Sequence, residues 1–247
     1  MLFLVDLGLI ALISIAACLS HSHLWIMTSV VGISYAFRMF LAWRRKEALF
    51  LLLATFVGGF NEFNTVDLHG VYRYRVEVFS PASGSIPLWM LLFWGLILRF
   101  AASLSWHWIR KVDHPGKPHW PRLTFLAALV LFTRLAIFQL YLDPIWSWLP
   151  FGLATVTYFV VLRPKPAYYS LFLLIAVAGT ATESVFIQVA GMHEYHLGVF
   201  GGVPLWITIW WSLGVLIWQE FGAILLPRLT ALENKGYRSK IVGQSSA

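Results

Sequence analysis

The sequence predicts an all-α integral membrane protein with about eight transmembrane helices. Three observations predict this class: 59% of the 247 residues are hydrophobic, only 12% are charged, and the mean hydropathy is +0.74. Soluble globular proteins carry about 25% charged residues, so too little polar surface remains here to cover a water-soluble globule. The single cysteine, Cys18, excludes a disulfide-rich or cysteine-ligated zinc scaffold.

Eight apolar stretches approach the length needed to cross a membrane, which is about 20 residues for a hydrocarbon core of roughly 30 Å. The stretches at 2–19 and 146–162 are the shortest. The predicted spans are 2–19, 24–42, 48–66, 86–105, 123–142, 146–162, 167–190 and 204–226.

The connections between these stretches differ sharply in positive charge. Thirteen lysine and arginine residues follow the second, fourth, sixth and eighth stretches, whereas the other connections carry only Arg73 and Arg75. Because positively charged loops remain in the cytoplasm, both termini are predicted to be cytoplasmic in a multi-pass protein of the inner (plasma) membrane. The cytoplasmic loops and anionic lipid headgroups then account for the net charge of +7, and no nucleic-acid partner is expected.

One sequence motif occurs twice. The pattern Glu-x7-Gly-x3-Tyr, followed by Pro-Leu-Trp-x4-Trp, begins at Glu62 and again at Glu183. Such duplication predicts two tandem four-helix repeats, and an even number of spans in each makes them parallel, related by an axis along the membrane normal. The predicted parts are a first repeat at 1–110, a cytoplasmic linker at 111–122, a second repeat at 123–228 and a cytoplasmic tail at 229–247.

Glu62 and Glu183 are the most informative residues of this motif. Each lies near the extracytoplasmic end of an otherwise apolar span, where an ionised carboxylate is costly. We therefore expect each to face the bundle interior, to find a partner or to stay protonated. Two interpretations remain open: the glutamates hydrogen-bond the two halves together, or they face a substrate.

Other ionisable residues give weaker signals. Several histidines fall on the extracytoplasmic side near acidic residues, but no spacing matches a known metal-ligand motif, so no metal site is expected. Arg134 is interpreted as the one basic residue deep in a span, with Asp6 or Glu183 as its candidate partner, whereas Arg99 lies nearer a cytoplasmic end and can snorkel. The histidines in question are His21, His23, His69, His193 and His196.

The duplicated motif resembles the membrane-embedded carotenoid hydratases and the lycopene cyclase domains. The likeness covers about forty residues in each half. It is carried by Glu62…Gly70-Val71-Tyr72-Arg73-Tyr74…Ile86-Pro87-Leu88 and by Glu183…Gly191…Tyr195…Val203-Pro204-Leu205.

This resemblance implies a function in carotenoid or related isoprenoid chemistry. A carboxylic acid kept neutral in a low-dielectric site protonates a double bond, and aromatic faces stabilise the resulting tertiary carbocation. Capture by water gives a hydrated product, and internal capture gives a ring. No cofactor is needed. The implied catalytic residues are Glu62 and Glu183, and the implied substrate-binding residues are Asn61, Tyr74, Trp89, Tyr195 and Trp206.

Two alternatives from other functional classes stay open. Intramembrane acids in a duplicated chain are also typical of secondary transporters of small solutes or lipids. A non-catalytic subunit of a membrane complex, or a homo-oligomer, is equally compatible with the tryptophan-rich composition. The sequence carries no phosphate-binding loop, dinucleotide fingerprint, Gly-x-Ser-x-Gly elbow or haem-attachment motif, which argues against nucleotide-driven transport and serine hydrolysis.

Overall fold

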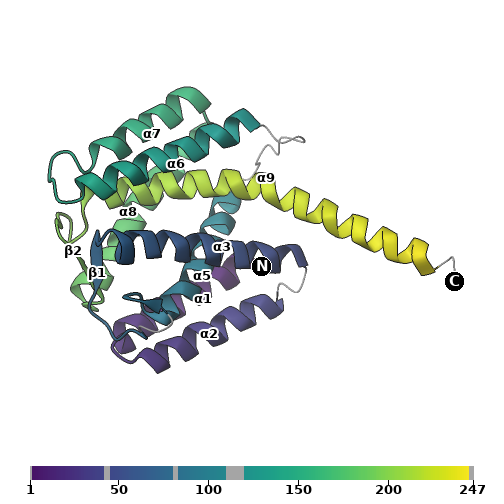
Figure 1. Cartoon of the computed structure of the whole chain (residues 1–247), viewed down its shortest axis with the longest axis horizontal. Helices are drawn as coiled ribbons and strands as arrows, with labels where there is room; N and C mark the ends of the chain where they lie inside the picture. The colour runs from purple at the N-terminus through teal and green to yellow at the C-terminus, as the bar shows by residue number, and fades with distance from the viewer. Residues whose placement is uncertain (1, 42–44, 80–82, 110–119, 245–247) are drawn as a thin grey trace.

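The computed structural model describes residues 2–41, 45–79, 83–109 and 120–244 (Figure 1). Most of the predicted linker 111–122 therefore lies outside the described residues. The elements are α1 (Leu2–Ser20), α2 (Leu24–Leu41), α3 (Arg45–Phe63), the π-helix η1 (Asn64–Leu68), β1 (Tyr72–Tyr74), α5 (Leu88–Ile109), α6 (Trp120–Leu140), α7 (Leu149–Leu162), α8 (Pro166–Gln188), β2 (His193–Tyr195) and α9 (Leu205–Gln244).

The structure confirms a multi-pass, all-α membrane protein. Seven helices in the described ranges are long and apolar enough to cross a membrane, and they match seven of the predicted stretches to within a few residues. The eighth stretch, 146–162, forms only the 14-residue helix α7, because residues 141–148 turn before Pro150 opens the helix. The tandem repeat and the cytoplasmic location of both termini stay predictions.

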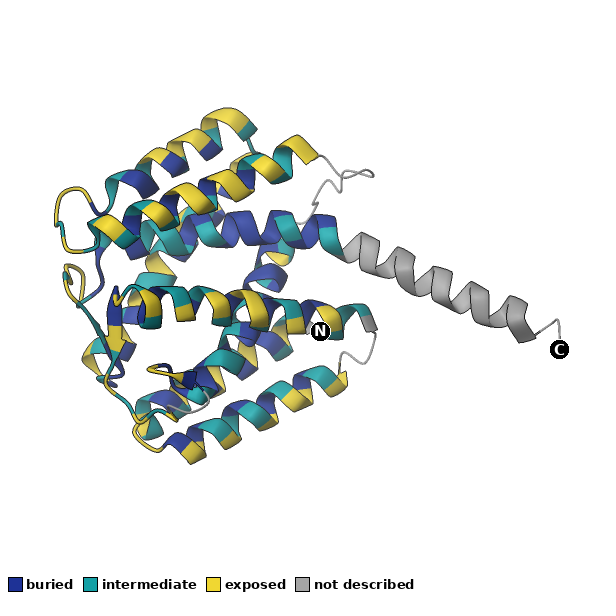
Figure 2. Ribbon diagram, viewed as in Figure 1, coloured by how far each residue is buried: buried dark blue, intermediate teal, exposed yellow. Residues whose placement is uncertain are grey.

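Two long helices form the centre of the bundle. α5 and α9 pack against each other, α3 runs along α5, and α8 runs along α9. α1 and α2 cover the outside of α5, whereas α6 and α7 cover α9 (Figure 1). The faces that point away from this centre are exposed (Figure 2), as expected for helices surrounded by lipid.

A glycine allows α3 to approach α5 closely. A Cβ atom placed on Gly58 would lie 2.5 Å from Cβ of Trp94, which is closer than real Cβ contacts. The corresponding contact between α8 and α9 is looser, because a Cβ on Gly179 would meet Cβ of Trp211 at 3.5 Å. The two indoles stack on each other between α5 and α9, with ring centres 5.5 Å apart.

Helix α9 continues past the predicted end of the last span at 226. It runs without a break to Gln244 and extends well beyond the body of the other helices (Figure 1). The predicted tail 229–247 is therefore helical over most of its length.

A buried network of ion pairs lies toward the end of the bundle where α1 begins. Arg38 of α2 bonds Asp6 of α1, and Arg99 of α5 bonds Glu47 of α3 at 2.8 Å. Ser103 donates to the second oxygen of Asp6 at 2.8 Å. The two cations and two carboxylates balance, which is how charges are tolerated inside a membrane protein.

This network corrects two predictions. Asp6 pairs with Arg38 and not with Arg134, and Arg38, in the last turn of α2, is a second basic residue buried within the bundle, at 1% exposure. Arg99 does not snorkel to the interface, because it is buried against Glu47 and lies over the Trp106 ring.

Candidate functional site

A two-stranded antiparallel ribbon covers the end of the bundle where α3 and α8 finish (Figure 1). We call this the ribbon end. Gly70 and Gly191 have φ values of +58° and +65°, in the left-handed region that favours glycine. The chain therefore turns from each helix into its strand at the glycine of the duplicated motif.

The ribbon has a polar outer face and an aromatic inner face, because side chains alternate along a strand. On the outer face, Arg73 and Arg75 form ion pairs with Glu194. Register pairs Tyr72 with Tyr195 and Tyr74 with His193, and these residues form the inner face.

Glu62 is held from the ribbon by two phenols. Its side chain comes from the last turn of α3 and is fully buried. Tyr72 and Tyr74 both donate hydrogen bonds to its Oε1 atom.

Glu183 of α8 is held in the matching way, with one chemical difference. Its Oε1 atom bonds the Nε2 atom of His193 at 2.9 Å and accepts the hydroxyl of Tyr195 at 2.6 Å. In both copies the partners stand ten and twelve residues after the glutamate, but an imidazole replaces the first phenol in the second copy.

The two glutamates meet at one shared cluster of rings. The Tyr72 and Tyr195 ring centres lie 5.0 Å apart, and His193 lies 5.9 Å from Tyr74. We call Glu62, Glu183 and the four rings the two-glutamate cluster. It satisfies the expectation that both acids face the bundle interior and find partners. It consists of Glu62, Glu183, Tyr72, Tyr74, His193 and Tyr195.

The tyrosines of the cluster act as neutral hydrogen-bond donors. Burial raises the pKa of Tyr72, Tyr74 and Tyr195 well above the ordinary value of 10.0. The neighbouring glutamates raise it further, Glu62 for Tyr72 and Tyr74, and Glu183 for Tyr195. The phenolic protons therefore stay in place throughout the physiological pH range.

These pKa directions give a first prediction, which alkaline titration of the purified protein tests. Because the folded-state pKa values are raised, the neutral phenols stabilise the fold fully below about pH 10 and this stabilisation is lost as the pH rises above it. Tyrosinate absorbance should show late-ionising tyrosines in the native protein, three of which belong to the ribbon, and all of them should ionise together with the rest in denaturant. Tyr72→Phe, Tyr74→Phe and Tyr195→Phe should each remove one late-ionising group; ionisation of all three at the ordinary pKa would contradict the cluster.

Two polar atoms beside Glu62 lack a partner. The indole N–H of Trp94 lies beside the Glu62 carboxylate. Neither Nε1 of Trp94 nor Oε2 of Glu62 reaches a hydrogen-bond partner in the described part of the chain, although both atoms are buried. Buried polar atoms are nearly always bonded, and here the indole N–H is itself a donor placed beside the carboxylate.

Arg134 of α6 lies next to the cluster. Its guanidinium carbon is 4.1 Å from the centre of the Trp210 ring, and it interacts electrostatically with Tyr72, Glu62 and Tyr195. No ion pair joins Arg134 to either predicted partner, Asp6 or Glu183, in the described residues; Asp6 pairs with Arg38, and Glu183 pairs with His193.

Some of the predicted substrate-binding residues lie at the two-glutamate cluster, and others lie elsewhere. Tyr74 and Tyr195 belong to the cluster, and Trp206 borders it through an edge-on contact with Tyr195 at 5.9 Å. Trp89 is fully buried and packs against Phe93 instead, and Asn61 contributes its backbone carbonyl to Thr65. The sequence prediction missed Tyr72 and His193 as cluster members, although both stand ten residues after a motif glutamate.

Three of the histidines considered as metal ligands bond or stack on other groups. No group of three or more His, Cys, Asp or Glu residues is suitably placed within the ranges that the structure describes. His193 bonds a glutamate, His196 bonds the Gly70 carbonyl, and His69 stacks on Phe138.

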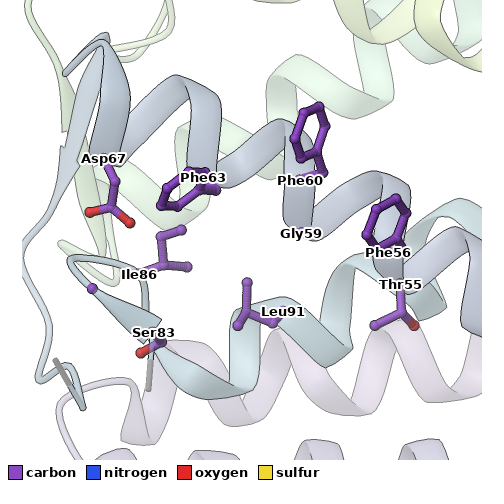
Figure 3. Close-up of a pocket in the computed structure, with 10 residues that line it drawn as sticks. Thr55, Phe56, Gly59, Phe60, Phe63, Asp67, Ser83, Ile86 and Leu91 are labelled. Atoms are coloured by element: carbon purple, nitrogen blue, oxygen red, sulfur yellow. The ribbon is translucent and has the colours of Figure 1, made fainter. Parts of the chain in front are cut away.

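An apolar groove lies on another face of α3 at the ribbon end (Figure 3). Its volume is about 430 Å³, within the range of small-molecule sites. Its lining includes three phenylalanines of α3 together with Leu91 and Ile86, and Asp67 is the charged residue of its lining. Neither motif glutamate lines the groove, so it is separate from the two-glutamate cluster. The phenylalanines are Phe56, Phe60 and Phe63.

Comparison with known proteins identifies the fold. No protein-family model and no curated protein matches the sequence. The crystal structure of MvINS, a mycobacterial Insig homolog from Mycobacterium vanbaalenii, is similar to this chain with a TM-score of 0.57 and 21% sequence identity. The match covers 75% of this chain and 96% of that one.

The chain therefore has an Insig-like fold. This likeness concerns the arrangement of the helices, and it leaves the function of the chain to be inferred from its own buried groups.

Proposed function

We propose that this protein acts on an isoprenoid or another lipid-soluble substrate by proton transfer from a carboxylic acid at the two-glutamate cluster. The observation that carries the proposal is the unequal environment of the two acids. Glu62 accepts hydrogen bonds from two phenols, whereas Glu183 bonds one phenol and the imidazole of His193. Paired titratable groups in different environments are typical of sites that use an acid and a base together.

The unequal environments assign a role to each residue. The neutral Glu62 donates a proton from Oε2 to a substrate double bond, which leaves a carbocation on the substrate. The faces of Trp206 and Tyr195 stabilise this cation. For hydration, water attacks the cation and its proton passes to His193, which Glu183 orients; the net reaction is the addition of water across the double bond.

The cluster also provides a route that restores the starting state. Tyr74 bonds Glu62 and lies opposite His193 in the ribbon. A proton that His193 has taken up returns to Glu62 through the Tyr74 hydroxyl, which accepts one proton and donates another. Both halves of the ribbon are needed for this step, which is why the two strands pair.

The remaining predictions belong to the same proposal. A substrate dissolved in the bilayer needs no aqueous domain, and the duplicated motif resembles that of the carotenoid hydratases and lycopene cyclase domains. We place the protein in the inner membrane as a tandem repeat with both termini in the cytoplasm, which puts the ribbon end on the opposite side.

The second prediction tests this function with an acyclic polyene. Membranes containing the protein should convert an acyclic isoprenoid, either lycopene or farnesyl phosphate, into a product with one added water or one new ring, and in D2O the product should carry one carbon-bound deuterium. Glu62→Gln and Glu183→Gln should each lower the rate by about 100-fold or more, because general acid–base groups contribute about 10²–10⁴-fold.

Glu194→Gln is the matched control, because this glutamate lies on the outer face of the ribbon. It should leave the rate unchanged. Full activity in both cluster variants would remove the mechanism, and solute counter-flow in proteoliposomes without any product would favour a transporter.

A further inference from the structure

Arg134 differs from three other buried or partly buried arginines that the structure describes. Arg38, Arg99 and Arg122 each bond a carboxylate side chain. The Nε and Nη2 atoms of Arg134 are buried and have no hydrogen-bond partner among the described residues. Glu62 interacts with Arg134 electrostatically but does not bond it.

The unpartnered atoms form one edge of the guanidinium group. Nε and Nη2 point in parallel directions, and this edge binds the two oxygens of a carboxylate or phosphate in a bidentate manner. Trp210 lies against the flat face of the group, which fixes its plane while leaving the edge free. The guanidinium is therefore oriented in advance for an oxyanion.

The neighbouring unpartnered atoms point to the same ligand chemistry. Nε1 of Trp94 is an N–H donor beside Glu62, and it reaches no hydrogen-bond partner in the described residues. The indole N–H and the guanidinium edge are both donors, so the partner that completes them is an acceptor. Leaving an intramembrane cation and such donors without a partner is costly.

The position of Arg134 on α6 favours an amphiphile over a soluble anion. Leu131 and Leu135, on the same helix, are 60% and 58% exposed on the outer surface of the bundle. Arg134 itself is only half-buried, so its stem adjoins this lipid-facing surface while its free edge faces the interior. A hydrocarbon chain in the bilayer can therefore continue directly into a headgroup at the guanidinium.

We propose that Arg134 binds the oxyanion headgroup, a carboxylate or a phosphate monoester, of an amphiphilic lipid substrate. The inference rests on the proposed function in one respect: it names the polar end of the molecule on which Glu62 acts. Binding of the headgroup beside Glu62 fixes the position of the hydrocarbon chain relative to the acid.

The inference is tested by measuring how tightly the purified full-length protein binds lipid probes in detergent. The probes are radiolabelled farnesyl phosphate and oleate, with farnesol as the neutral counterpart. The wild type should bind at least one anionic probe more tightly than farnesol. Arg134→Met should weaken that binding by about 10- to 100-fold, the usual effect of losing charged hydrogen bonds, and leave farnesol binding unchanged.

Two further variants separate the bidentate contact from general attraction. Arg134→Lys keeps the positive charge but loses the paired donors, so it should bind the anionic probe less tightly than the wild type and more tightly than Arg134→Met. If Arg134→Met fails to fold, the affinity of Arg134→Lys alone shows whether the paired donors bind the anionic probe. Arg73→Gln, at an exposed arginine of the ribbon end, should leave affinity unchanged.

The relative affinities of the probes identify the headgroup and test the inference. Tighter binding of farnesyl phosphate or of oleate identifies the headgroup as phosphate or carboxylate. Equal affinity of the wild type for anionic and neutral probes, or unchanged affinity in both Arg134 variants, would overturn the inference. If the wild type binds the anionic probes but hydrates no isoprenoid, the proposed function alone is contradicted. If it hydrates an isoprenoid but does not prefer the anionic probes, this inference alone is contradicted.

Discussion

Replacing Arg38 with methionine is expected to lower the free energy of unfolding by about 3–5 kcal/mol, because it leaves a buried carboxylate without its partner. Arg38 bonds Asp6 and lies 3.9 Å from Glu47, and all three belong to the buried network toward the start of α1. Without Arg38, two carboxylates share the single cation Arg99. Thermal or denaturant unfolding in detergent measures the loss.

The double variant Asp6→Leu with Arg38→Met is the decisive control. It removes one charge of each sign and leaves the balanced pair of Arg99 and Glu47, so it should be more stable than Arg38→Met alone. Arg73→Met should cost less than about 1 kcal/mol, because its ion pair with Glu194 is exposed. A loss under 1 kcal/mol for Arg38→Met would mean that the buried network does not form.

Gly58→Ala is expected to have the next largest effect on stability. The added Cβ would meet Cβ of Trp94 at 2.5 Å, and overpacking of this kind costs about 1–3 kcal/mol or more. Trp94 cannot move away easily, because it is stacked on Trp211 in the centre of the bundle. The added methyl group should therefore push α3 away from α5 and move Glu62 away from the ribbon.

Gly179→Ala is the matched substitution in the other half. Its Cβ would meet Trp211 at an ordinary 3.5 Å, so the change should be neutral or should stabilise α8 by up to about 1 kcal/mol through helix propensity. The two alanine variants should differ by about 1–4 kcal/mol in unfolding free energy. Equal stabilities would show that the approach of α3 to α5 is looser than described.

Most of the helices could be predicted from the sequence because the bilayer sets their length. A run of about 20 apolar residues is a strong signal, and seven predicted stretches correspond to seven long helices. α7 was predicted too long for a physical reason: Trp146 and Trp148 are apolar, but the Asp143 side chain bonds the backbone of residues 145 and 146 and holds them in a turn.

The ribbon could not be predicted, because three-residue strands have no periodic signal. Their pairing depends on two segments 121 residues apart, which the spacing within each motif does not reveal. The sequence did predict that Glu62 and Glu183 face the bundle interior, but it did not name their partners. It did not show that Tyr72 and Tyr195 face each other, which is what joins the two acids in one cluster.

The charged partners were the least predictable part of the site. Ion pairs inside the bundle join α1 to α2 and α3 to α5, and the rotation of each helix decides which side chains meet. Asp6 and Arg38 are 32 residues apart and carry no shared spacing. The position of Arg134 against Trp210 likewise depends on how α6 packs on α9.

The short helix α7 has a consequence for the surrounding bilayer. Its 14 residues extend about 21 Å at 1.5 Å per residue, which is less than the hydrocarbon thickness of about 30 Å. Acyl chains beside α7 must tilt or become disordered so that the hydrocarbon layer matches the short helix. The membrane is therefore expected to be locally thinned on that flank. The protein should accordingly accumulate in thinner bilayers when reconstituted with lipids of mixed chain length.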